Sequence, residues 1–295
     1  QVGADDANYR GTLTLTGDND FEGDTEVDSV LNVGSATALS AQSKLKVNNG
    51  GTVKLNGFDS TVAGLEGNGT IQGSAALTAG DENDATFSEI LQDGTGALAF
   101  TKQGSGTQTL TGSASYTGAT TINAGTLQLG DGTDGNDGTI AGTSIVNNAD
   151  LTYNRFGTAS YGGVISGSGT VTKEGAGTQT LTGANTYSGG TFINGGTVEI
   201  TADNNLGASS GGLSFDGGAL DTGTKSLTID RAITLQNGGA TFAVDNAANN
   251  KTISLTGEIS GTGGLTKTGT GTVALGGANT YSGETQVKKG TLALA

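Results

Sequence analysis

The 295-residue sequence contains no histidine, cysteine, proline, methionine or tryptophan, and 13 Lys and Arg residues face 28 Asp and Glu. Without histidine, a Ser-His-Asp triad cannot form. Without cysteine, no disulfide pattern indicates the redox compartment. The lack of proline fits strands that lie inside hydrogen-bonded ladders, where every N–H is needed. The formal charge of −15 opposes binding to nucleic acid or anionic lipid, so we expect neither a nucleic-acid partner nor direct membrane contact from this segment.

Glycine is abundant instead, with 55 residues, while hydrophobic residues make up only 33%. Such a composition is compatible with disorder. However, Thr, Leu, Ile and Val alternate with polar residues in short runs that Gly and Asn separate, as in 121–123 and 126–129. β-branched residues suit a pleated sheet, and Gly and Asn tolerate the positive φ of tight corners. The pattern therefore predicts a chain made almost entirely of short strands and turns.

One motif occurs four times. Residues 106–130 read GTQTLTGSASYTGATTINAGTLQLG, residues 177–200 read GTQTLTGANTYSGGTFINGGTVEI, and residues 271–294 read GTVALGGANTYSGETQVKKGTLAL. A worn copy occupies 11–34. A similar lead-in strand precedes the last two copies, so we place the copies near 11–34, 102–130, 173–200 and 267–295.

The spacing of the copies predicts a solenoid. The aromatic residue of the motif is Phe21, Tyr116, Tyr187 and Tyr281, and the intervals are 95, 71 and 94 residues. These intervals are close to four, three and four multiples of about 24 residues, a period that solenoid repeats use. We therefore predict an all-β, right-handed parallel β-helix that runs through 1–295 as a single unit, with about 12 rungs of ~24 residues. Copies of the motif are expected to recur at the same angular position.

The consensus GxGTxTLTGxNTYSGGTxINxGTLxL resembles the passenger-associated strand repeat of bacterial autotransporters, which use type V secretion. The resemblance implies a β-helical passenger segment at the surface of a Gram-negative cell, in a parent chain anchored in the outer membrane. It further implies an adhesin or stalk in adhesion, autoaggregation or biofilm formation. The partners would be host matrix, host cell-surface molecules or sister molecules. The lack of an initiator Met, a signal peptide and a membrane span leads us to expect an excised fragment.

Two other functions remain open. A β-helical polysaccharide-active enzyme needs two carboxylates about 5–10 Å apart. Asp221 and Asp245, 24 positions apart, could stack on neighbouring rungs, and the available arginines are Arg10, Arg155 and Arg231. We favour turn residues for these aspartates and predict no catalytic residue. The second alternative is a toxin or signalling passenger whose loop at 131–137 binds a host receptor.

The polar run 130–138 is predicted to be a loop that leaves the solenoid. Asp131, Asp134 and Asp137 could gather Ca²⁺, but the run lacks the EF-hand pattern, so we favour a structural loop and predict neither metal nor cofactor.

Two glycine patterns are interpreted as structural. Gly207–Gly211 matches the Gly-x-Ser-x-Gly of a nucleophile elbow, which we attribute to the abundance of Gly and Ser. The pairs Gly104/Gly106, Gly175/Gly177 and Gly269/Gly271 are interpreted as corners.

The aromatic residue of the motif is predicted to pack at a corner. Because Phe21 replaces tyrosine in the worn copy, we expect the ring to matter and the hydroxyl not to. No ligand-binding residue can be assigned from the sequence.

Overall fold

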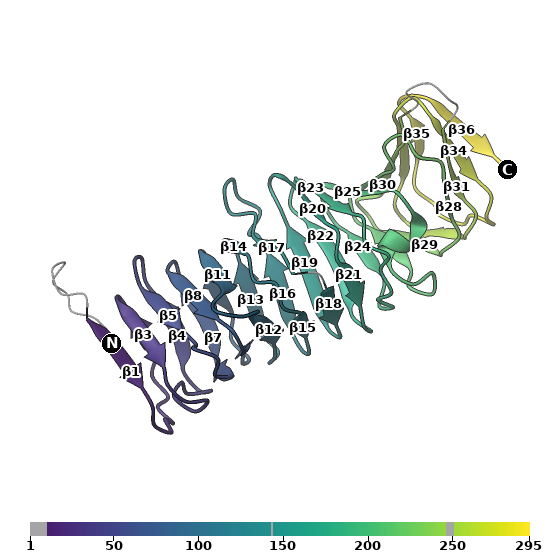
Figure 1. Cartoon of the computed structure of the whole chain (residues 1–295). Helices are drawn as coiled ribbons and strands as arrows, with labels where there is room; N and C mark the ends of the chain where they lie inside the picture. The colour runs from purple at the N-terminus through teal and green to yellow at the C-terminus, as the bar shows by residue number, and fades with distance from the viewer. Residues whose placement is uncertain (1–10, 143, 246–250) are drawn as a thin grey trace. The chain divides into compact units, whose positions relative to one another are not determined.

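The computed structural model describes residues 11–142, 144–245 and 251–295. It separates into two compact units, one formed by residues up to 131 with 136–151, the other by 132–135 with 152–295. Within each unit, successive strands lie side by side in parallel stacks (Figure 1). The all-β parallel solenoid is therefore confirmed, while a single continuous unit over 1–295 stays a prediction. Residues 130–138, predicted to be a loop, contain no strand.

The first unit is built from three parallel sheets. Their strand orders are β1-β3-β5-β8-β11-β14-β17, β2-β4-β7-β10-β13-β16 and β6-β9-β12-β15-β18. The strands are β1 (Thr12–Leu15), β2 (Thr25–Val27), β3 (Val30–Val33), β4 (Lys44–Val47), β5 (Thr52–Lys54), β6 (Ser60–Val62), β7 (Gly64–Gly67), β8 (Thr70–Gly73), β9 (Ala76–Ala79), β10 (Ala85–Phe87), β11 (Ile90–Asp93), β12 (Ala99–Lys102), β13 (Thr107–Leu110), β14 (Ser113–Ala114), β15 (Thr120–Ile122), β16 (Thr126–Leu129), β17 (Thr139–Ile140) and β18 (Ser144–Asn147).

The second unit repeats this arrangement. Its sheets have the orders β22-β24-β26-β29-β32, β20-β23-β25-β27-β30-β33-β35 and β28-β31-β34-β36. The elements are β19 (Asp150–Asn154), β20 (Thr158–Tyr161), β21 (Val164–Ser166), β22 (Thr170–Glu174), β23 (Thr178–Leu181), β24 (Thr191–Ile193), β25 (Thr197–Ile200), the 3₁₀ turn η1 (Asp203–Leu206), β26 (Leu213–Phe215), β27 (Ala219–Asp221), β28 (Leu227–Ile229), β29 (Ile233–Leu235), β30 (Ala240–Ala243), β31 (Thr252–Leu255), β32 (Ile259–Gly261), β33 (Leu265–Thr268), β34 (Thr272–Leu275), β35 (Thr285–Val287) and β36 (Thr291–Leu294).

The rungs are shorter than predicted. Residues paired between neighbouring strands are as few as 17 positions apart, as in Ser60 and Leu77, and as many as 26, as in Ile233 and Ile259. The chain therefore makes about 14 turns rather than about 12. The difference arises because corners of different length close the rungs, so the interval between motif copies is no multiple of a fixed rung.

The prediction that motif copies share one angular position is wrong. In the first unit, the TxTL strand of the worn copy is β1 and that of the second copy is β13, and these strands belong to different sheets. In the second unit, the corresponding strands are β23 and β34, which again belong to different sheets. The two copies within each unit are therefore offset by part of a turn.

Most strands away from the ends of the described chain bury one side chain in two, which explains how 33% hydrophobic residues suffice. Leu45 and Val47 of β4 point inward and alternate with the half-exposed Lys44 and Lys46. Inward residues of neighbouring strands are in register, as Leu213 and Ile233 are, and the ring centroids of Phe215 and Phe242, which belong to different sheets, lie 5.2 Å apart. The resulting core is a narrow column of aliphatic and aromatic side chains.

Candidate functional site

A buried lysine marks the start of three motif copies. Lys102, Lys173 and Lys267 each lie on a lead-in strand and are no more than 1% exposed. The Lys102 ammonium donates hydrogen bonds to the carbonyls of Gln103 at 2.5 Å, Gly104 at 2.8 Å and Ala124 at 3.2 Å. Three acceptors match the three donors of an ammonium group, so these carbonyls hold the charged form. Burial alone acts the other way and lowers the pKa of Lys102.

The same cage recurs in the later copies. Lys173 donates to the carbonyls of Glu174 and Gly175, and Lys267 donates to those of Thr268, Gly269 and Lys289. The Lys102 and Lys267 cages each join two successive rungs, because the carbonyls of Ala124 and Lys289 lie 22 positions further along the chain. The lysine is therefore part of the corner rather than an exposed binding group.

The glycine pairs next to these lysines are corners, as predicted. Gly104, Gly175 and Gly269 have φ values of 69°, 69° and 72°, in the region that glycine adopts readily. The second glycine of each pair is required by close packing. A Cβ on Gly177 would lie 2.1 Å from the carbonyl oxygen of Gly157.

The motif tyrosine packs at a corner, but its hydroxyl also takes part. Tyr116 and Tyr187 are fully buried, which agrees with the predicted packing. Each motif tyrosine has its hydroxyl 2.6 Å from the threonine four positions later, in the pairs Tyr116–Thr120, Tyr187–Thr191 and Tyr281–Thr285. The hydroxyl thus has a hydrogen-bond partner in these copies, which the expectation did not include.

The worn copy reorganises this contact. Phe21 has no hydroxyl, and Thr25, four positions later, instead lies 3.0 Å from the hydroxyl of Ser43. Where Phe21 replaces the tyrosine, the buried hydroxyl of Thr25 therefore pairs with Ser43 instead. This is expected because leaving a buried hydroxyl without a hydrogen bond costs free energy.

The asparagine of the motif connects neighbouring rungs through side-chain hydrogen bonds. Asn185 accepts a hydrogen bond from the N–H of Ile165 at 2.8 Å and donates to the carbonyl of Asn205 at 2.6 Å. Asn279 accepts one from the N–H of Ile259 at 3.0 Å. In the second copy Ala114 takes this position and belongs to strand β14, whose backbone pairing replaces the side-chain contacts.

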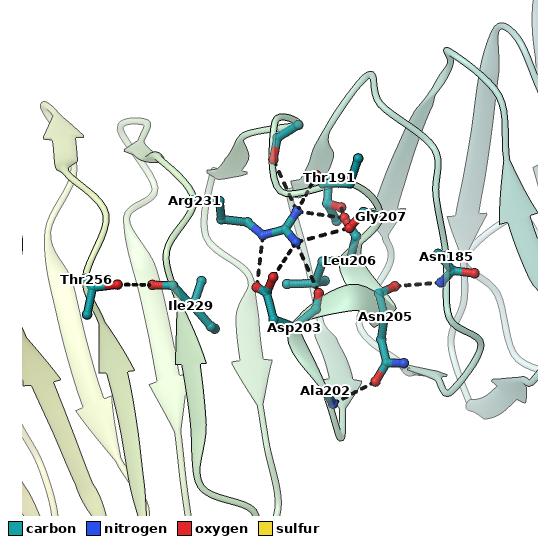
Figure 2. Close-up of polar contacts among 12 residues, drawn as sticks. Asn185, Thr191, Ala202, Asp203, Asn205, Leu206, Gly207, Ile229, Arg231 and Thr256 are labelled. Atoms are coloured by element: carbon teal, nitrogen blue, oxygen red, sulfur yellow. Dashed lines mark hydrogen bonds and ion pairs between the residues drawn. The ribbon is translucent and has the colours of Figure 1, made fainter.

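Figure 2 shows the most extensive polar cluster, in which Arg231 lies against η1 and the loop that follows it. The side chain is fully buried and forms an ion pair of 2.9 Å with Asp203, which is 24% exposed. Nη1 donates to the carbonyls of Leu206, Ala208 and Gly211, and Nη2 to those of Asp203 and Gly207, at 2.9–3.2 Å. Nε donates to the Asp203 carboxylate at 3.1 Å. Every guanidinium nitrogen is therefore engaged.

This cluster explains the Gly207–Gly211 pattern. The segment is not a nucleophile elbow. It is the loop whose carbonyls surround Arg231. Gly207 has φ of 79°, and a Cβ there would lie 2.5 Å from the carbonyl oxygen of Tyr187. The backbone conformation thus accounts for Gly207, while the bonds to Arg231 use backbone carbonyls that other residue types would supply equally.

Buried glutamines occupy the same motif position in two copies. Gln108 exchanges hydrogen bonds with the backbone N–H and carbonyl of Leu65 at 2.9 and 3.0 Å. Gln179 accepts a 2.6 Å hydrogen bond from Nε of Arg155, which also lies over the ring of Tyr153. The burial of these two glutamines, like that of the lysines, was not predicted from the sequence. The recurrence of glutamine at one motif position could have indicated it.

Asp221 and Asp245, which were considered as a less favoured pair of stacked carboxylates, are not in register. Asp221 pairs with Glu199 on one neighbouring strand and with Ala243 on the other, so Asp245 lies two positions further along. Burial raises the pKa of Asp221, and Glu199 and Asp245 add to this effect. Two of the three arginines considered for an enzyme, Arg155 and Arg231, are buried in hydrogen-bonded positions, and Arg10 lies outside the described residues.

The acidic loop has local contacts of its own. The side chain of Asn136 donates to the Asp131 carboxylate at 2.9 Å, and the Asp131 N–H donates to the Asn136 carbonyl at 3.2 Å. Across residues 11–142, 144–245 and 251–295, no group of three or more acidic side chains is placed to hold a metal ion. Over the same ranges, no helix has the length and apolarity needed to cross a membrane.

The outward faces of the sheets carry polar ladders with isolated apolar groups. Glu26, Lys46 and Glu66 are in register on β2, β4 and β7, and the Lys46–Glu26 ion pair measures 2.9 Å. Such exposed pairs contribute little to stability, typically about 0–1 kcal/mol. Phe192 stands out on β24 because it is an aromatic side chain, 37% exposed, on an otherwise polar face.

Comparison with known proteins agrees with this geometry. The passenger-associated-transport-repeat model matches residues 10–29, 100–129, 171–200 and 265–294. The chain is 39% identical over 128 residues to an adhesin, the BmaC autotransporter of Brucella suis biovar 1 (strain 1330), covering 40% of this chain and 4% of the adhesin. Two extracellular serine proteases of Serratia marcescens are 68% and 67% identical over 37 and 36 residues, or 12% of this chain. No solved structure matches.

The chain spans 3–4% of the length of these relatives. The last three matched segments coincide with the lysine cages, tyrosine corners and glycine turns described above. Passenger domains of this family are secreted to the cell surface. The four matched segments carry passenger-associated-transport repeats, and in sequence and fold the chain is similar to autotransporter passenger domains of the adhesin type.

Proposed function

We propose that this passenger segment is non-enzymatic and adhesive, and that its exposed sheet faces contact host matrix, host cell-surface molecules or sister molecules. Self-contact would support autoaggregation and biofilm formation. In this proposal the parent chain is anchored in the outer membrane. The similarity to an adhesin autotransporter over 128 residues carries the proposal, because it extends well beyond one motif copy.

The serine protease matches favour shared architecture over shared chemistry. They cover 36–37 residues, little more than the 30 residues of one matched repeat. The chain has no histidine to serve as the base of a catalytic triad. The arginines Arg155 and Arg231 are already engaged in buried contacts, so they are poorly placed to act on a substrate.

The proposal is tested by displaying the chain on bacteria that neither clump nor adhere. Display levels are matched to those of cells that display an unrelated solenoid of similar length. We expect the displayed chain to increase attachment to cultured host cells or matrix-coated surfaces, or to speed settling of the suspension. Equal attachment and settling in both strains would contradict an adhesive role. Depolymerisation of an added polysaccharide by the purified chain would contradict the non-enzymatic part.

A further inference from the structure

A departure of the chain from its own repeat points to a ligand site. The second residue of the TxIN strand faces outward in every copy, and the four copies carry Glu26, Thr121, Phe192 and Gln286 there. Three of these are polar, as expected for a solvated face of a sheet. At this strand position only the third copy carries an aromatic ring, and a phenyl group exposed among polar neighbours loses the benefit of burial. Solenoid stability does not explain this residue, because the polar residues serve equally well in the other copies.

Phe192 lies in a shallow groove of about 250 Å³ on the second unit. In register beside it, Ser214 and Thr234 face outward on β26 and β29, and Gln236 follows β29. Neighbouring strands are about 4.8 Å apart, so these groups extend roughly 10 Å from the ring. The groove is lined by Gly189, Gly190, Phe192, Gly212, Leu213, Ser214, Thr234 and Gln236. The glycines leave one flank of the ring open.

The polar groups of the groove are available to a ligand. The side chains of Ser214, Thr234 and Gln236 form no hydrogen bond within the described part of the chain, and all are at least partly exposed. The hydroxyls both donate and accept, and the amide of Gln236 does the same. These groups therefore present donors and acceptors beside an apolar ring.

The lining excludes two common ligand classes. It contains no charged residue, although the chain as a whole has a formal charge of −15, so neither a cationic nor an anionic ligand finds a counter-charge. Strand β24 pairs with β22 on one side and β26 on the other, so a peptide cannot add to an open sheet edge here. Recognition must use side chains on a flat face.

We infer that the Phe192 groove binds a neutral oligosaccharide of a host glycoconjugate. A pyranose ring has an apolar face of C–H groups that stacks on an aromatic ring, while its hydroxyls pair with hydroxyl and amide side chains at the rim. The separation of the ring from Gln236 accommodates about two sugar residues. This inference rests on the proposed adhesive function and names the ligand class for one of its faces.

The test is an array of neutral and sialylated host-type glycans and neutral bacterial polysaccharides, probed with the intact 295-residue chain and followed by calorimetric titration of the best neutral glycan. We expect saturable binding to neutral host-type glycans. Phe192→Thr should weaken it at least about tenfold, since loss of an aromatic contact and its buried area corresponds to that change in Kd. Gln236→Ala should weaken binding while the ring stays in place.

Matched variants separate folding from binding. Thr is the natural residue at the equivalent position of the second copy, Thr121, so Phe192→Thr is expected to keep its thermal unfolding curve. Phe58→Thr is the control, because Phe58 is also 37% exposed but lies in the first unit. It should leave glycan binding unchanged. Equal weakening by Phe58→Thr would overturn the assignment to the Phe192 groove.

Three further results would overturn the inference. The first is that no neutral glycan binds at concentrations up to about 10 mM, the weak end of useful affinity. The second is that Phe192→Thr leaves glycan binding unchanged. The third is that the chain prefers sialylated glycans or bacterial polysaccharides to neutral host-type glycans. The adhesive proposal is judged separately in the display assay. If displayed cells still attach when they carry Phe192→Thr, the groove is wrong and the adhesive role stands. If displayed wild-type cells do not attach although the purified chain binds glycan, the adhesive role is wrong.

Discussion

Arg231 and its surrounding loop offer the sharpest test of how the second unit is held together. The fully buried guanidinium donates to five backbone carbonyls and both carboxylate oxygens of Asp203. Arg231→Met fills similar space but removes every donor. The carbonyls of 203, 206, 207, 208 and 211 then lose this donor, and the Asp203 carboxylate loses its ion-pair partner.

Breaking a buried ion pair by removing one partner costs about 3–5 kcal/mol. Asp203 is 24% exposed and can regain some hydration, which places the expected loss near the lower end, at about 3 kcal/mol. Asp203→Asn keeps an acceptor for the guanidinium, so it should cost less. A double-mutant cycle between the two positions should give a coupling energy of about 1–3 kcal/mol.

The assay must report locally, because solenoids unfold through coupling between neighbouring rungs rather than in one step. Amide hydrogen exchange should show faster exchange in 201–213, and the urea midpoint followed by circular dichroism should fall. Lys225→Met removes an exposed cation of the same unit and serves as the control. If Arg231→Met and Lys225→Met give the same exchange pattern and midpoint, the reasoning about the arginine cage is refuted.

Three further changes follow from the repeated corner and from Asp221. Tyr187→Phe removes the hydroxyl that pairs with Thr191 and should destabilise by about 1 kcal/mol in urea melts, and no loss would mean that the pair is dispensable. Lys102→Met leaves three carbonyls without their charged donor and should cost about 2 kcal/mol, whereas Lys54→Met on an outward position should be neutral, and equal effects would contradict the cage. Burial raises the pKa of Asp221 above 3.8 in the folded state, so the native state binds more protons and stability falls as pH rises through this window. Asp221→Asn should therefore be more stabilising at about pH 7 than at about pH 3, and a pH-independent difference between the two urea midpoints would contradict the shift.

The fold class was predictable because local signals agree. Period-two alternation in runs such as 126–129 specifies strands, and Gly with positive φ at positions such as Gly125 specifies corners. A motif that returns several times then leaves few architectures other than a solenoid. Burial of every second residue, as seen in β4 and β16, follows from the same alternation.

Rung length and angular position were not predictable from the motif spacing. The spacing fixes the total residues between copies but not how corners divide them. Paired residues are 17 apart at Ser60 and Leu77 but 26 apart at Ile233 and Ile259, so a common divisor has no structural meaning. Corner length depends on packing against the next rung, which a single sequence does not reveal.

The buried polar residues were missed for a different reason. Lysine, glutamine and arginine are usually exposed, so a hydrophobicity pattern places them outward. Lys102 and Arg231 instead satisfy carbonyls that corners leave unpaired. Recurrence of lysine in three copies was the available signal. Arg231 has no counterpart in another copy, and only the three-dimensional arrangement of 203–211 accounts for it.

The central claim is that this passenger segment is itself adhesive. The most direct measurement is equilibrium binding of the purified, fluorescently labelled chain to cultured host cells and immobilised matrix, with excess unlabelled chain as competitor. We predict saturable binding that the unlabelled chain displaces and that heat-unfolded chain does not reproduce. A folded chain that binds no better than an unrelated solenoid of similar length would contradict it and would leave this segment a passive spacer.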